Sequence, residues 1–116
     1  MKIYVRHSTD FNFEQKLYKP LMRSRVSDRH EIILPHRSEF TNSKEIIMGC
    51  DLMAAEVSYP STGLGIELGW AEEFNTDVVC IHRREEKPSK AIQVVTEDAE
   101  SYRDEDEIIN VIADNI

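Results

Sequence analysis

One segment of the chain, residues 51–71, limits the fold more than any other, because a buried strand, a turn and a helix follow one another directly. Residues 52–57 are nearly all apolar, as expected of a parallel strand covered on both faces. Residues 59–65 then supply turn-forming side chains, hydroxyls and free backbone N–H groups. Glu67 follows in the first turns of the helix, where the helix dipole favours an ionised carboxylate. The segment therefore predicts a ligand site with an acid beside its opening.

Strand and helix patterns alternate along the rest of the chain. Residues 2–6 read as a first strand, and residues 11–25 have a helical spacing that Pro20 kinks or splits. Residues 88–96 read as a crossover helix, because too few residues separate them from the preceding strand for a direct parallel return. The other predicted elements are a turn at 27–30, a strand at 31–34, a helix at 43–48 capped by Asn42, a strand at 77–82, an edge strand at 100–102 and a last helix from 104.

Five strands that alternate with helices predict a single-domain, doubly wound five-stranded parallel sheet with helices on both faces, a flavodoxin-like fold. In such sheets ligands bind outside the carboxyl ends of the strands, where the strand order reverses. The groups expected at that edge are His7 and Ser8 after the first strand, His36 after the second, residues 58–65 after the third and His82 at the end of the fourth.

Composition excludes several classes of protein. The 116 residues have 41% hydrophobic content, which suits one domain with one core. No apolar run is long enough for a membrane span, and the chain opens on a strand pattern instead of a signal peptide, so the cytoplasm is the expected compartment. A net charge of −8 argues against a nucleic acid polymer as partner. Cys50 and Cys80 read as buried thiols.

The 51–71 segment also resembles a known family. Its pattern is similar to that of the nucleoside 2-deoxyribosyltransferases and the related deoxynucleoside-monophosphate N-glycosidases, in which a strand D-x-x-x-A-E-V meets a Pro-Ser turn and then G-x-G-x-E-L-G-x-A. The opening KIYVRHS resembles the first strand and ligand-contacting loop of that family. The matching residues of this chain are Asp51, Ala55, Glu56, Val57, Pro60, Ser61, Gly63, Gly65, Glu67, Leu68, Gly69 and Ala71.

The resemblance implies a deoxyribosyltransferase-like domain over residues 1–116, a nucleoside or nucleotide as substrate, and no cofactor. The family glutamate that matches Glu67 attacks the anomeric carbon of the sugar, as in retaining glycosidases. Transfer to a second base and hydrolysis by water differ only in the acceptor, and both stay open. The expected substrate contacts are sugar hydrogen bonds from Ser8, Asp51 and Ser61, the Gly63 and Gly65 turn, a base slot near Tyr4 and Tyr59, and a proton from His7 or a second acid.

Two positions depart from the family. Its members usually carry an aspartate that positions the sugar and handles the proton, and this chain has Ser43 there, which is a candidate contact but no base. The monophosphate-specific branch has an arginine where this chain has Asp10, and an acid there is expected to repel a 5′-phosphate, although Ser8 and Ser61 match the phosphate-contacting serines of that branch. A noncatalytic nucleotide-binding or interaction module of the same fold is therefore the alternative function.

Other site types find little support in the sequence. His7, His36 and His82 come from different strand ends and lack the close spacing of metal motifs, so no metal site with Glu67 is expected. The run from Gly63 lacks the third glycine of the dinucleotide fingerprint. A domain this small encloses little of a nucleoside alone, which predicts a homodimer or higher homo-oligomer close to the active-site edge. Its expected apolar contacts are Ile46, Ile47, Ile66 and Trp70.

Overall fold

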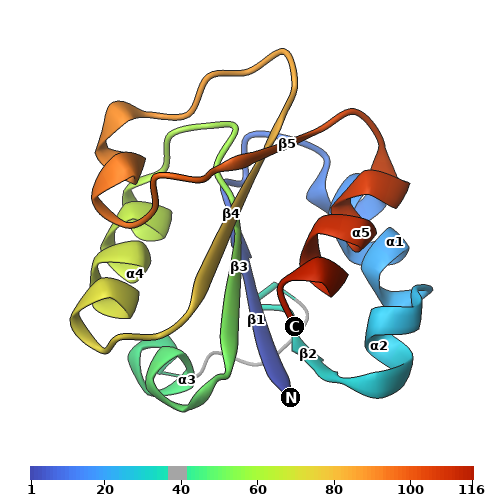
Figure 1. The fold of residues 1–116 in the computed structure, drawn as a ribbon, viewed down its shortest axis with the longest axis horizontal. Helices are drawn as coiled ribbons and strands as arrows, with labels where there is room; N and C mark the ends of the chain where they lie inside the picture. The colour runs from blue at the N-terminus through green and yellow to red at the C-terminus, as the bar shows by residue number, and fades with distance from the viewer. Residues whose placement is uncertain (37–41) are drawn as a thin grey trace.

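The computed structural model describes residues 1–36 and 42–116 and contains a five-stranded parallel sheet between two layers of helices (Figure 1). The strand order β2-β1-β3-β4-β5 reverses direction between β1 and β3, as in the flavodoxin-like folds. The doubly wound sheet that the sequence predicts is thereby confirmed. The strands are β1 Lys2–His7, β2 Glu31–Ile33, β3 Leu52–Glu56, β4 Val78–Arg83 and β5 Glu100–Tyr102.

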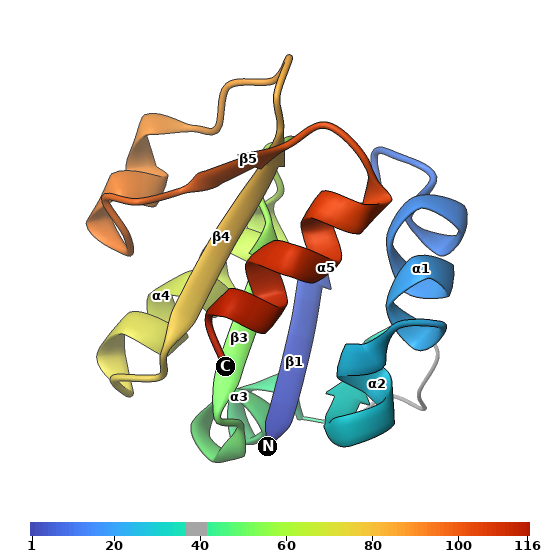
Figure 2. The ribbon, with the colours of Figure 1, turned by 45° about the vertical axis from the view of Figure 1, so that its right-hand side comes forward.

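Helices cover both faces of the sheet (Figures 1 and 2). One face carries α1 Lys19–Met22, α2 Arg25–Arg29 and α5 Glu105–Asp114, and the other carries α3 Ser43–Gly49 and α4 Thr62–Glu73. Two further turns are the π-helical η1 Glu14–Tyr18 and the 3-10 helix η2 Lys90–Val94. Within the described ranges, every helix is too short or too polar to cross a bilayer.

The alternation of side chains along β1 divides the core into two clusters. Successive residues of a strand point to opposite faces of the sheet. Ile3 and Val5 pack in the cluster beneath α1 and α5, whereas Tyr4 packs in the cluster beneath α3 and α4. Arg6, two residues after Tyr4, therefore shares the α4 face, and His7 shares the face of α1.

The segment between β1 and β2 differs from the prediction. The helix expected over residues 11–25 is divided among η1, α1 and the start of α2. Pro20, which has no N–H, lies in the first turn of α1, and the chain breaks at Ser24, whose backbone is extended. The turn expected at 27–30 is wrong, because α2 continues to Arg29 with Val26 buried beneath it.

The remaining elements follow the sequence closely. Asn42 caps α3 by accepting a hydrogen bond from the Lys44 N–H at 3.1 Å. The short η2 falls inside the predicted crossover, and β5 is the predicted edge strand. Asp104 caps α5, which buries Ile108, Ile109 and Ile112, whereas Ile116 lies beyond the end of the helix and is exposed. The carboxyl ends of all strands therefore reach the edge on which the site was expected.

Candidate active site

The turn after β3 leads directly into α4 at the carboxyl edge of the sheet. Ser61 is the N-cap of α4, and its Oγ accepts a hydrogen bond from the Leu64 N–H at 3.4 Å. Its carbonyl oxygen also accepts the Gly65 N–H at 3.0 Å. These bonds fix the first turn of the helix, so that Glu67, one turn further on, points back towards β1.

Glu67 is buried, and its carboxylate is bound by two side chains of β1. The Tyr4 hydroxyl donates a hydrogen bond of 2.6 Å to Oε1, and Arg6 Nε forms an ion pair with Oε2. Burial and the neighbouring carboxylate raise the pKa of Tyr4, so the hydroxyl stays protonated and remains a donor. Only 5% of the Glu67 surface is exposed, and Arg6 supplies a counter-charge beside it.

Arg6 is the site residue that sequence reasoning missed. Its guanidinium crosses the start of α4 at Gly63, where a Cβ on the glycine would lie 2.7 Å from Nη2. Gly63 thus leaves room for the guanidinium, while an added Cβ at Gly65 would meet open space. The signal was present in the sequence, because positions 4 and 6 of a strand share one face.

Tyr4 does not line a base slot, which corrects the sequence prediction. It is 1% exposed, and its contact with the site is the hydrogen bond to Glu67. Aromatic rings that follow β1, β2 and β3 instead lie together at the same edge. The ring centroids of Phe11 and Tyr59 are 5.7 Å apart, and those of Phe13 and His36 are 5.1 Å apart.

His7 lies on the opposite face of β1 from Tyr4 and Arg6. Its Nδ1 is 2.7 Å from the Ser8 carbonyl oxygen, which can only accept, so Nδ1 carries the proton and Nε2 accepts the Tyr18 hydroxyl at 2.6 Å. Burial lowers the pKa of His7 to about 4. His7 is therefore neutral at neutral pH and engaged at both nitrogens. It is not placed to supply the proton expected of it.

Ser8, Ser61 and Gly65 lie at the predicted edge. Ser8 is buried, and its Oγ accepts the Asp10 N–H at 3.1 Å. Ser61 and Gly65 line a hollow of about 350 Å³ together with Tyr59 and Ile92 of η2. Glu67 does not line this hollow but lies beneath the start of the same helix.

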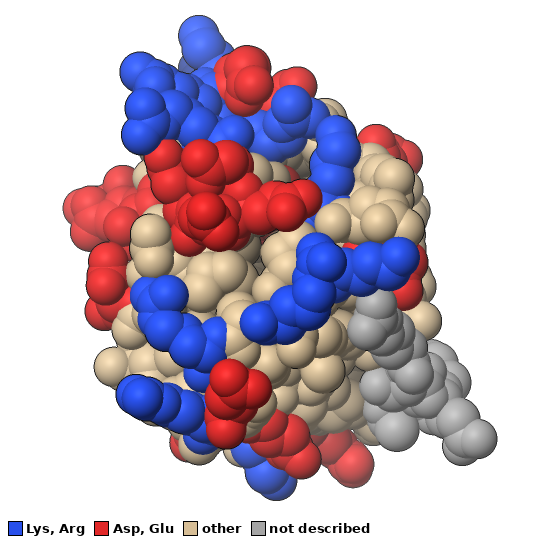
Figure 3. All heavy atoms as spheres, turned by 90° about the vertical axis from the view of Figure 1, so that its right-hand side faces the viewer, with Lys and Arg blue, Asp and Glu red and all other residues tan. Residues whose placement is uncertain are grey.

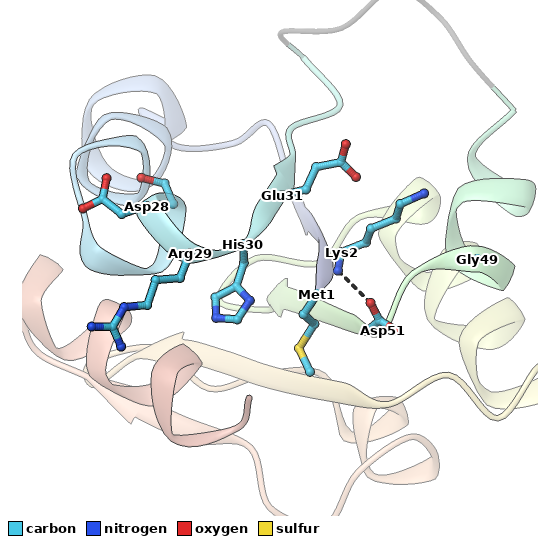
Figure 4. A pocket seen from close by; sticks show the side chains of 9 residues that line it. Met1, Lys2, Asp28, Arg29, His30, Glu31, Gly49 and Asp51 are labelled. Carbon is cyan, nitrogen blue, oxygen red and sulfur yellow. Dashed lines mark hydrogen bonds between the residues drawn. The ribbon is translucent and has the colours of Figure 1, made fainter.

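Asp51 is at the wrong edge for a sugar contact. It precedes β3, at the amino ends of the strands, where its Oδ2 accepts the Lys2 N–H at 2.7 Å (Figure 4). It lines a hollow with Met1, His30 and Glu31, on the side of the sheet away from the β3–α4 turn. The prediction that Asp51 binds the sugar is therefore wrong in this structure, because strand direction separates it from Glu67.

Ser43 begins α3, which packs against the later part of α4. The ammonium of the next residue, Lys44, is 5.7 Å from the Trp70 ring centroid and 5.9 Å from that of Phe74. No hydrogen bond between described residues joins Ser43 to Glu67 or Arg6. The structure does not bring Ser43 into contact with the carboxylate.

A second buried carboxylate, Glu56, has a structural set of partners. Ser58 donates to it from its N–H at 2.6 Å and from its hydroxyl at 3.0 Å, and the Tyr102 hydroxyl donates to Oε2. The Ser58 Oγ also accepts the Arg83 N–H at 2.8 Å. Glu56 thereby ties together the carboxyl ends of β3, β4 and β5.

Two other kinds of site find little support at this edge. In the described part of the chain, no three His, Cys, Asp or Glu side chains are placed to hold a metal ion. A hollow beside α5 contains Lys16, Arg83 and Arg103, but Asp104, Glu105 and Asp106 line it as well. Figure 3 shows blue and red side chains side by side at the top of that face. This surface therefore offers an anion little net positive charge.

The fold and the buried Glu67 define a flavodoxin-like α/β protein with an acidic site after β3. No protein-family model matches the chain. Over 68 residues, or 52% of the chain, it is 34% identical to the "Putative 2′-deoxynucleoside 5′-phosphate N-hydrolase 1" of Nematostella vectensis. The matched part spans 45% of that relative, so the chain covers about half its length.

Solved structures share the fold over nearly the whole chain. The CMP N-glycosidase BcmB of Clostridium botulinum superposes with a TM-score of 0.67 at 16% identity, over 100% of both chains. The 2-deoxyribosyltransferase of Bacillus psychrosaccharolyticus gives a TM-score of 0.62 at 22% identity, over 95% of this chain and 91% of that one. With the sequence match, these findings confirm the resemblance to the deoxyribosyltransferase and N-glycosidase family.

Proposed function

We propose that the chain cleaves or transfers the N-glycosidic bond of a nucleoside or nucleotide, with Glu67 as the nucleophile. The observation that carries this proposal is the buried carboxylate of Glu67, held by Tyr4 and Arg6, on the second turn of the helix that follows β3. A carboxylate with few rotamers and no bulk water around it is suited to attack at carbon. The names of the similar proteins support the same class of reaction.

The proposed reaction proceeds in two displacements. An oxygen of Glu67 forms a bond to the anomeric carbon while the bond from that carbon to the base nitrogen breaks, and the base leaves with the electron pair and takes a proton from solvent water. Water or a second base then attacks the same carbon and gives up a proton to solvent, and the electron pair of the ester bond returns to Glu67. The Tyr4 hydroxyl, which stays protonated, keeps the carboxylate oriented in both steps.

Release of free base from a substrate panel tests this function. Nucleosides, 2′-deoxynucleosides and their 5′-monophosphates are incubated with the wild type and with Glu67→Gln, and base is measured by chromatography. We expect the wild type to release base from at least one substrate and Glu67→Gln to keep less than about 1% of that rate. Appreciable release by the variant would remove Glu67 from the role.

A noncatalytic nucleotide-binding module is the second candidate, and Ser43 favours it. A neutral hydroxyl replaces the family aspartate, and it makes no described contact with Glu67. The same panel separates the two functions, because a binding module would retain a ligand in calorimetry yet release no base from any substrate.

We also propose that the chain acts as a homodimer or higher homo-oligomer. Ile66 is 51% exposed on α4, Trp70 one turn further along α4 is half-buried, and so is Ile46 on the neighbouring α3, which leaves apolar surface on these two helices. Ile47 cannot contribute as expected, because it is fully buried in the core.

The sheet runs through the described residues from β1 to β5, which suits one deoxyribosyltransferase-like domain over 1–116. A cytoplasmic location stays a prediction.

A further inference from the structure

The carboxylate of Glu67 is closed off in this structure at both of its oxygens. Oε1 accepts the Tyr4 hydroxyl at 2.6 Å, and Oε2 forms the ion pair with Arg6 Nε. Both atoms of that ion pair are shielded from solvent. A carbon under attack must come within about 3–3.5 Å of the attacking oxygen. Because even water does not reach Oε2, an anomeric carbon cannot reach it while Arg6 stays in this position.

Arg6 is the partner of the carboxylate that can leave. Tyr4 is 1% exposed and packs in the core cluster beneath α3 and α4. The Arg6 side chain is 19% exposed, and its guanidinium stands at the end of a long, flexible chain. The Nε atom makes no hydrogen bond with a described residue, so the ion pair lacks the directional bond that strengthens arginine–carboxylate contacts. Rotation about the Arg6 side-chain bonds can therefore open the carboxylate.

Gly63 provides the space in which the guanidinium lies. A Cβ at this position would be 2.7 Å from Arg6 Nη2, closer than such atoms pack, whereas a Cβ at Gly69 on the same helix would meet open space. Neither glycine has a positive φ, so the backbone accepts alanine at both positions. Glycine is therefore needed at position 63 to seat the Arg6 side chain, and not for the conformation of α4.

We propose that Arg6 is an autoinhibitory latch on Glu67. This inference rests on the proposed function and adds its regulation. In the closed state the guanidinium neutralises the carboxylate and covers Oε2, and the low dielectric of a buried site strengthens their attraction. In the open state the guanidinium turns away from Gly63 and leaves Oε2 free to attack, while Tyr4 still holds Oε1. The protein therefore acts only through the fraction of molecules in which the latch is open.

Chemical labelling of Glu67 measures this opening without any turnover. The protein is treated with a water-soluble carbodiimide and an amine, which convert accessible carboxylates to amides, and the modified side chains are identified by peptide mass spectrometry. Glu72, an exposed residue of the same helix, is the internal standard. We expect Glu67 in the wild type to be labelled at least about tenfold more slowly than Glu72, because the reagent reaches only the open molecules.

Two substitutions should open the latch by different means. Gly63→Ala displaces the guanidinium with a methyl group, and Arg6→Met removes its charge. Each should raise the labelling rate of Glu67 relative to Glu72 by about tenfold or more. Gly69→Ala is the matched control and should leave this rate unchanged, because its Cβ meets open space. The double variant should be labelled no faster than Arg6→Met, because Gly63→Ala acts only through Arg6.

Labelling of Glu67 in the wild type at the rate of the two opened variants overturns the latch. A further increase in the double variant overturns it as well, because it would show a general loosening of α4. Where the wild type releases base, release should also rise in Gly63→Ala or Arg6→Met, and a rise in neither overturns the inhibitory role. Thermal melts confirm that each variant is folded, and either one suffices if the other is not. If the labelling pattern holds and no protein releases base, only the proposed reaction is overturned.

Discussion

At the scale of the residue, the Tyr4 hydroxyl is the best-defined partner of Glu67. Tyr4→Phe removes a buried hydrogen bond of 2.6 Å and leaves Oε1 without a donor. We expect a loss of about 1–3 kcal/mol in the free energy of unfolding, measured by urea denaturation at pH 7. Tyr59→Phe is the control, because that hydroxyl is half-exposed and makes a contact of 3.4 Å with Arg83. Equal losses in the two variants would contradict the assigned role of Tyr4.

His7 predicts how stability depends on pH. Its pKa falls from 6.5 to about 4 on folding, so the unfolded chain binds the additional proton between these values. Stability that is present above pH 6.5 is therefore lost as the pH falls, by up to about 3 kcal/mol near pH 4. His7→Gln, which cannot titrate, should flatten the dependence between pH 6.5 and pH 5. If the free energy of unfolding of the variant changes with pH as steeply as that of the wild type, groups other than His7 cause the pH dependence.

At the scale of the element, β5 has only three residues and depends on a contact across β4. The Tyr102 hydroxyl reaches the Glu56 carboxylate, which Ser58 also binds. Tyr102→Phe should therefore loosen β5, seen as faster amide hydrogen exchange at residues 100–102 with no change in β1 and β3. If exchange rises equally in all strands, the carboxylate stabilises the sheet as a whole and does not anchor the edge.

The sequence predicted these elements to different degrees. The hydrophobic periodicity of the sequence and its helix N-cap residues predicted all five strands and α3, α4 and α5. In these elements the local sequence pattern agrees with the burial of the side chains. A kink or split of residues 11–25 at Pro20 was predicted, but the π-turn and the break at Ser24 were missed, since they depend on packing against α5. Glu67 was found from its motif. Arg6 was missed, because its ion pair with Glu67 joins residues that are far apart in the sequence. Asp51 was misplaced, because it precedes β3 and the direction of that strand puts it at the opposite edge of the sheet from Glu67.

At the scale of the whole molecule, the exposed apolar surface of α4 predicts self-association. Light scattering at micromolar concentration should give at least twice the chain mass of 13.5 kDa. Ile66→Lys should shift the protein towards the monomer, because it places a charge on that surface. Met22→Lys is the matched control, with similar exposure on α1 across the sheet. A wild type that is monomeric at all of these concentrations and still binds its ligand would contradict a binding site completed by a second subunit.

Mass spectrometry of the protein during turnover shows whether Glu67 forms a bond to the sugar. The wild type is quenched in acid while it consumes the best substrate of the panel, digested, and searched for a peptide that has gained one sugar residue. We expect this mass on the peptide that contains Glu67, with fragmentation placing it on that side chain, and no adduct in Glu67→Gln. A sugar on another residue, or undiminished base release by Glu67→Gln without an adduct, would contradict it.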